Sequence, residues 1–185
     1  MKFKEHSDPE ILIPRHITQF CLYTCQMILL ESFISYYYGY RLLGIMQFIL
    51  YLSSTTFWRK IKRGGIERIV DMICVTMTLS YATYESLFIP LFYTRVWIIS
   101  LITGIIIFIK NEQLFYYQVI QFYNKELPTN PLYEYHYFST EYTNPNTLAR
   151  ELAYYRNVVT HGLVVHVGLS GAGIYCVMHN PFLLC

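Results

Sequence analysis

The sequence predicts an all-α protein, a polytopic bundle of transmembrane helices, and three observations lead to this prediction. Of its 185 residues, 54% are hydrophobic and 14% are charged, whereas soluble proteins carry about 25% charged residues. The apolar residues gather in runs close to the ~20 residues needed to cross a bilayer. The charged residues lie mostly between these runs. We therefore expect about five spans and an interfacial helix within a single integral membrane domain, residues 1–185.

The N-terminal half predicts two spans joined by a tight turn. Residues 1–16 form a polar N-terminal segment of mixed charge that lacks the basic start and cleavage site of a secretory signal. The first span covers about 17–38, and YYYGYR at 36–41 predicts an aromatic interface with a glycine turn. The second span runs from Arg41 to about Trp58.

The turn at 59–68 contains the strongest cluster of positive charge in the chain. It has Glu67 as its one acidic residue and five basic residues, Arg59, Lys60, Lys62, Arg63 and Arg68. Basic loops remain on the side of a membrane from which the chain is inserted. The turn is therefore expected on the cytoplasmic side, or on the matrix side in a mitochondrion.

The third predicted span, 66–88, carries a small and polar face. At about 100° per residue, this face contains Asp71, Cys74, Val75, Thr78, Ala82 and Glu85. Small and polar residues let helices approach closely and form hydrogen bonds across their interface. We expect this helix at the centre of the bundle.

The C-terminal half predicts a fourth span over 92–110 and a last span over 158–178. Between them, 113–123 is too short to cross a bilayer separately, and is expected as an interfacial helix or a continuation of the fourth span. A sixth span is the alternative. Residues 124–149 form a polar loop rich in Pro and Asn.

Five spans bring hydroxyl, carboxylate and imidazole groups to one side of the membrane at similar depth. Ser53 and Ser54 end the second span, Asp71 begins the third, and His161 and His166 begin the last. Ionisable groups inside a membrane are costly and mark functional positions by default. Imidazole acts as a base or metal ligand, and a carboxylate can orient it or assist binding.

The order of these residues resembles that of the CREST-like membrane hydrolases, which include alkaline ceramidases and adiponectin-receptor-like proteins. That family uses zinc held by three histidines, with Ser and Asp assisting hydrolysis of a lipid amide or ester. The resemblance implies that Ser54 and Asp71 are catalytic and that His161 and His166 bind the metal. It implies zinc as the cofactor, which the residues alone leave unknown.

This chain also departs from the pattern of that family. Trp58 lies four residues after Ser54, where the family has another metal-binding histidine. The last pair is His-x₄-His rather than His-x₃-His, which turns the second ring by about 140° on a regular helix. A π-type bulge at Gly162 would restore alignment. A degenerate relative without zinc chemistry is the alternative.

Each of these residues also has a purely structural interpretation. Ser53 and Ser54 can satisfy backbone carbonyls near a helix end, and Asp71 can pair with Arg68 or Arg63. His161 and His166 can form hydrogen bonds between helices, or bind a metal or haem. Cys21 and Cys25 are interpreted as small packing residues.

Two functional hypotheses from different classes follow. The first is a non-catalytic membrane subunit or scaffold that packs within a larger membrane assembly, and the second is the metal-dependent lipid amide or ester hydrolase. Whether the protein is an enzyme stays open between them. The expected partners are the lipid bilayer and other membrane subunits. Nucleic acid is excluded, because the formal net charge is only +2.

Overall fold

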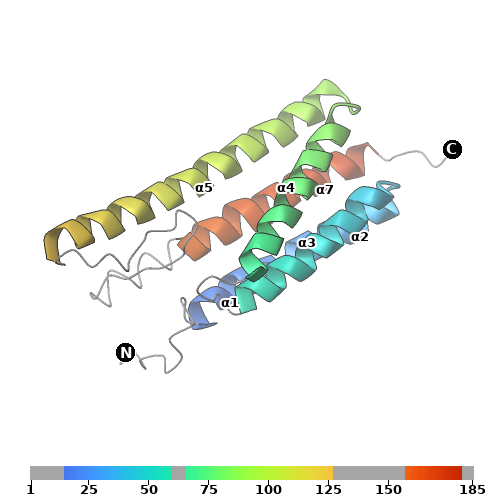
Figure 1. Cartoon of the computed structure of the whole chain (residues 1–185). Coiled ribbons are helices and arrows are strands. Elements are labelled where there is room, and N and C mark those ends of the chain that lie inside the picture. Colours follow the sequence, from blue (N-terminus) through green and yellow to red (C-terminus); the bar gives the residue numbers. More distant parts are fainter. Residues whose placement is uncertain (1–14, 60–65, 127–156, 181–185) are drawn as a thin grey trace.

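The computed structural model describes residues 15–59, 66–126 and 157–180, and every regular element within these ranges is helical. The elements are α1 (Arg15–Thr24), α2 (Gln26–Tyr37), α3 (Arg41–Arg59), α4 (Ile66–Ser86), α5 (Leu91–Glu126), the π-helix η1 (His161–Leu169) and α7 (Ser170–His179). Figure 1 shows how these helices lie in space. The all-α prediction is confirmed. Most of the basic turn, 60–65, and the polar loop from 127 onward lie outside the described residues.

The first predicted span consists of two helical pieces, α1 and α2, that meet at Cys25. The Cys25 N–H still donates to the carbonyl of Cys21 at 2.8 Å, so the chain keeps its helical direction through the junction. The hydroxyl of Thr24 donates to the same carbonyl at 3.1 Å. Such side-chain bonds to the preceding turn commonly bend helices.

The turn between α2 and α3 is built on Gly39. Its φ of 95° lies in the left-handed region, where a residue with a Cβ is strained. The Tyr40 N–H donates to the carbonyl of Ser35 at 2.9 Å, the longer bond of a Schellman motif. The predicted glycine turn is confirmed, and it folds α3 back along α2.

The α2–α3 pair packs backbone against backbone at Gly44. A Cβ at this position would lie 2.8 Å from the carbonyl oxygen of Ser32, so only glycine fits. The hydroxyl of Ser32 donates to the Gly44 carbonyl at 2.8 Å. This contact shows how a small residue and a short polar side chain join two helices.

The expectation that the third predicted span lies at the centre of the bundle is not met. Helix α4 packs mainly against α3 and α5. Helix α2 has more neighbours, since it contacts α1, α3, η1 and α7. On α4, Asp71 and Thr78 are buried, while Ile73 and Met77 are 53% and 59% exposed. Helix α4 therefore buries its polar face against the bundle and leaves an apolar face outward, which places it at the edge.

Helix α5 is continuous for 36 residues, about 54 Å at the rise of an α-helix. The stretch 113–123 is therefore a continuation of the fourth apolar segment, one of the two outcomes expected for it. By length and apolar composition, two helical stretches of the described residues are able to cross a membrane, Leu91–Lys110 and Asn157–His179.

Many large apolar side chains face outward, and the interior holds polar as well as apolar side chains. The buried apolar residues include Ile28, Leu43, Leu50, Val158 and Val177. The buried polar side chains include Glu31, Gln47, Ser54, Asp71, Thr78, His166 and Ser170. Large apolar side chains that face outward include Phe33, Phe48, Ile49, Ile73, Met77, Ile99 and Ile106. Soluble proteins seldom expose extended apolar surfaces.

Candidate functional site

The carboxylate of Asp71 is held by the two serines of α3. The hydroxyl of Ser54 donates to Asp71 Oδ1 at 2.6 Å, and that of Ser53 donates to the same oxygen at 2.9 Å. Ser54 and Asp71 are 2% and 8% exposed. Ser53 also bonds the Leu50 carbonyl at 3.0 Å, as the structural interpretation predicted. The two bonds from the serines to Asp71 join α3 to α4.

His161 and His166 are brought together by the π-helix. A π-helix repeats its hydrogen bonds at i→i+5, so two residues five apart lie over one another rather than on different faces. The two rings have centroids 4.9 Å apart and stand perpendicular at 90°. The irregularity expected at Gly162 is therefore present, because η1 includes this residue.

Gly162 lets the π-helix form where it does. It lies near the start of the helical stretch Asn157–His179, which contains η1 and α7 and is called the last helix below. A Cβ there would lie 2.7 Å from the ring of Phe20 and 2.9 Å from the hydroxyl of Thr24. The absence of a side chain lets η1 approach α1 closely. At that contact, Thr24 Oγ1 lies 2.8 Å from His166 Nδ1, and Cys25 Sγ lies 3.7 Å from the same nitrogen.

Trp58 lies beside both histidines. Its ring centroid is 5.1 Å from that of His161 and 6.2 Å from that of His166. The side chain is 6% exposed, and its indole N–H has no hydrogen-bond acceptor among the described residues. A buried donor without a partner destabilises a folded protein by about 1–3 kcal/mol. The position of the Trp58 N–H therefore calls for a physical explanation.

All four predicted site residues, Ser54, Asp71, His161 and His166, line one cavity of about 200 Å³. Trp58, Arg68 and Asn157 line it as well. The remaining lining is apolar and comes mainly from α4, α5 and the last helix. The structure thus brings the predicted residues to one place, as the order of the spans indicated.

The described residues do not fit the zinc site that the resemblance implies. No group of three or more His, Cys, Asp or Glu side chains in the described ranges is arranged to hold a metal ion. His166 Nδ1 contacts Thr24, and Asp71 Oδ1 accepts two serine hydroxyls. Trp58 fills the place beside the two imidazoles with a ring that offers no lone pair.

Sequence reasoning missed the residues that hold His166. Thr24 and the junction at Cys25 come from α1, more than 140 positions away in the chain. The available signal was the pair of threonines in this segment, Thr18 and Thr24, six positions apart; the structure buries both. Such a signal does not identify the partner.

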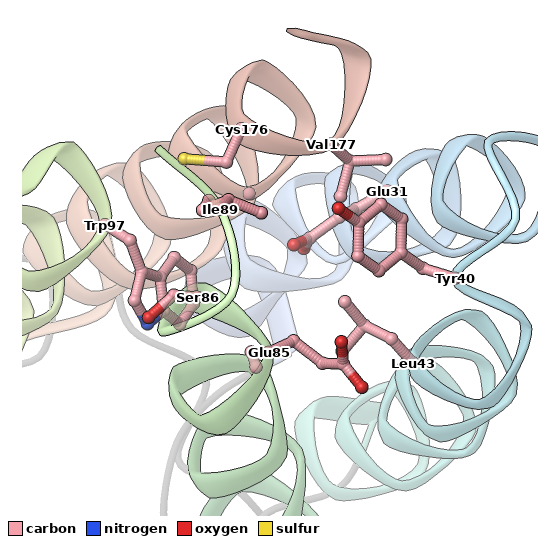
Figure 2. Close-up of a pocket in the computed structure, with 11 residues that line it drawn as sticks. Glu31, Tyr40, Leu43, Glu85, Ser86, Ile89, Trp97, Cys176 and Val177 are labelled. Atoms are coloured by element: carbon pink, nitrogen blue, oxygen red, sulfur yellow. The ribbon is translucent and has the colours of Figure 1, made fainter. Parts of the chain in front are cut away.

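A second polar pocket of about 30 Å³ lies toward the other end of the bundle. Figure 2 shows Glu31 from α2, Tyr40 from the turn and Glu85 from α4 around it. The Glu31 carboxylate lies against Gly173, where a side chain would collide with it. The Tyr40 hydroxyl donates to the Asn180 carbonyl at 2.6 Å. These groups join α2 to the last helix.

No protein-family model matches the chain, and comparisons with curated proteins and with solved structures give no match.

Proposed function

We propose that this chain is a multi-pass integral membrane protein without catalytic activity, a subunit or scaffold that packs within a larger membrane assembly. The observation that supports this proposal most strongly is the large number of big apolar side chains on the outer surface, together with the polar groups buried among the helices. Lipid is the solvent in which such a surface is stable, since apolar faces need no cover there. The basic turn at 59–68 then lies on the cytoplasmic or matrix side.

The residues that resemble a catalytic set act as helix connectors in this proposal. Ser53 and Ser54 bind Asp71 across α3 and α4, and Thr24 contacts His166 across α1 and η1. Hydrogen bonds of this kind hold helices together in lipid, where the hydrophobic effect does not drive their association.

Alkaline extraction and sizing test this proposal. The protein is expected to stay in the membrane pellet at alkaline pH and, in mild detergent, to migrate well above its 22.0 kDa monomer mass. Asp71→Asn is expected to reduce the amount of the large species without affecting any lipid turnover. Release into the supernatant contradicts membrane integration, and a monomer in mild detergent contradicts the role as a subunit.

A second candidate function is hydrolysis of a lipid amide or ester. It is favoured by one observation, the convergence of Ser54, Asp71, His161 and His166 on a largely apolar cavity. Purified protein that contains stoichiometric zinc and releases fatty acid from a ceramide or an ester would establish it. Protein without either property supports the non-catalytic role.

A further inference from the structure

We propose that the cavity beside Trp58 holds one acyl chain of a membrane lipid, whose carbonyl oxygen accepts a hydrogen bond from the Trp58 indole N–H. This inference rests on the proposed membrane location and goes beyond the role as a subunit. Its first basis is Trp58, which lines the cavity and whose buried indole N–H has no acceptor among the described residues.

The size and lining of the cavity fit an acyl chain rather than water. A water-sized group needs about 10–15 Å³ of space, so about 200 Å³ has room for more than ten such groups. Beside its polar residues, the cavity has an apolar wall made of Met72, Val75 and Leu79 from α4 and Leu101, Ile105 and Phe108 from α5. Along this apolar wall water would lack hydrogen-bond partners, whereas methylene groups need none.

The cavity has its polar end where the carbonyl of a lipid lies in a bilayer. Trp58 is one residue from the end of α3, Arg68 is in the first turn of α4, and Asn157 begins the last helix. These positions mark one end of the bundle, next to the basic turn. Deeper in the cavity the lining is apolar, with Leu79 and Leu101 on the facing helices.

An acyl chain can enter from the side. Helices α4 and α5 meet at residues 87–90 and diverge toward the opposite end of the bundle (Figure 1). Ile105 lines the cavity and is nevertheless 47% exposed, so the wall at this point also faces outward. In a membrane, that outward side meets the tails of neighbouring lipids.

The two tryptophans of the chain provide a direct test. Trp97→Phe leaves Trp58 as the single fluorophore, and Trp58→Phe leaves Trp97, which is 4% exposed and donates to Thr83 at 3.1 Å. In vesicles of chain-brominated phosphatidylcholine, a quencher on the acyl chain is expected to reduce Trp58 emission several-fold more than Trp97 emission. Equal quenching of the two overturns the inference.

Filling the cavity is the matched control. Val75→Phe and Leu79→Phe add side-chain volume on α4 without touching the indole, and each is expected to reduce Trp58 quenching to the level of Trp97. Quenching that persists in a correctly folded filled variant also overturns the inference. Circular dichroism shows whether each variant is folded. Two variants are used so that the test can still be made if one of them does not fold.

The source of the acyl chain is resolved by a second arm. A brominated free fatty acid is added to the Trp97→Phe protein in unbrominated phosphatidylcholine vesicles. Quenching in this arm identifies a free acid as an occupant, and quenching only with brominated phosphatidylcholine identifies a glycerolipid.

The contribution of the indole N–H is measured by native mass spectrometry. Trp58→Phe is expected to lower the fraction of protein that retains a lipid by about 2- to 10-fold, the effect of one neutral hydrogen bond. Unchanged retention rejects the hydrogen bond. Protein that stays in the membrane pellet at alkaline pH but shows no Trp58 quenching rejects this inference alone and leaves the proposed location standing.

Discussion

Among the single residues, Trp58 has the largest effect on the chemical character of the candidate site. Its ring contacts the rings of both His161 and His166. An imidazole at this position would face two others, whereas the indole presents a flat apolar surface and one N–H donor. The difference between a metal site and a binding cavity therefore depends on this one side chain.

Trp58→His is expected to create a zinc site. The substitution places a third imidazole beside His161 and His166, and three such ligands suffice for a zinc site. Elemental analysis of purified protein is expected to show about one zinc per chain in the variant, with Trp58→Phe as the control. Zinc already bound to the unaltered protein contradicts this interpretation of Trp58.

Ser54→Ala is expected to destabilise the fold by about 1–2 kcal/mol, because a buried Asp71 oxygen loses its shorter hydrogen bond. Ser53→Ala is expected to cost less, since Ser53 is only partly buried and shares its hydroxyl with Leu50. Unfolding in detergent, followed by circular dichroism, measures both. Ser80→Ala is the control, because Ser80 is exposed on α4. Equal stability of all three variants contradicts the assigned role.

At the scale of elements, the π-helix places His161 and His166 on one face, although residues five apart lie on different faces of an α-helix. On a regular helix, residues five apart diverge by about 140°. In η1, His161 and His166 have centroids 4.9 Å apart. The close approach of α1 at Gly162 accompanies this geometry.

Gly162→Ala is expected to destabilise the protein by about 1–3 kcal/mol, because the added methyl overlaps Phe20 and Thr24 across the α1–η1 contact. Gly171→Ala in the same apolar stretch is the matched control. Nothing lies within 4 Å of a Cβ at Gly171, so this change is expected to be neutral or to stabilise by up to about 1 kcal/mol. Thermal unfolding in detergent compares the two. Equal effects argue against a tight contact at Gly162.

At the scale of the whole molecule, the helices form a bundle whose polar groups connect its members. One polar cluster, around Asp71 and His166, joins α1, α3, α4 and η1. Another, around Glu31, joins α2 and the last helix. Each lies near one end of the bundle, and the outer surface between them is apolar.

Cysteine labelling tests whether α4 crosses the membrane in the proposed topology. Arg59→Cys and Phe88→Cys place thiols before and after α4, and both positions are exposed. An impermeant maleimide is expected to reach these two positions from opposite sides. The unaltered protein measures the background labelling of its own cysteines, of which Cys21, Cys25 and Cys176 are buried and Cys74 is partly buried. Labelling of both positions from the same side contradicts a crossing by α4.

Local patterns predicted the individual helices well. Gly39 predicted the turn, because a left-handed residue after a helix favours glycine. The polar stripe on α4 predicted that Asp71 and Thr78 are buried. The order of the helices also predicted that Ser54, Asp71 and the two histidines meet, and they line one cavity. Periodicity and composition act over short distances, so the sequence carries these signals directly.

The sequence by itself determined the helical class, the turn at Gly39 and the polar face of α4, because these depend on local geometry and on which residues avoid water or lipid. Only the tertiary structure decided that α4 lies at the edge and that Thr24 contacts His166. It also decided that the buried Trp58 N–H, beside a cavity, has no acceptor in the part of the chain that the structure describes. These features depend on how helices distant in the chain approach one another, and no single segment encodes that approach.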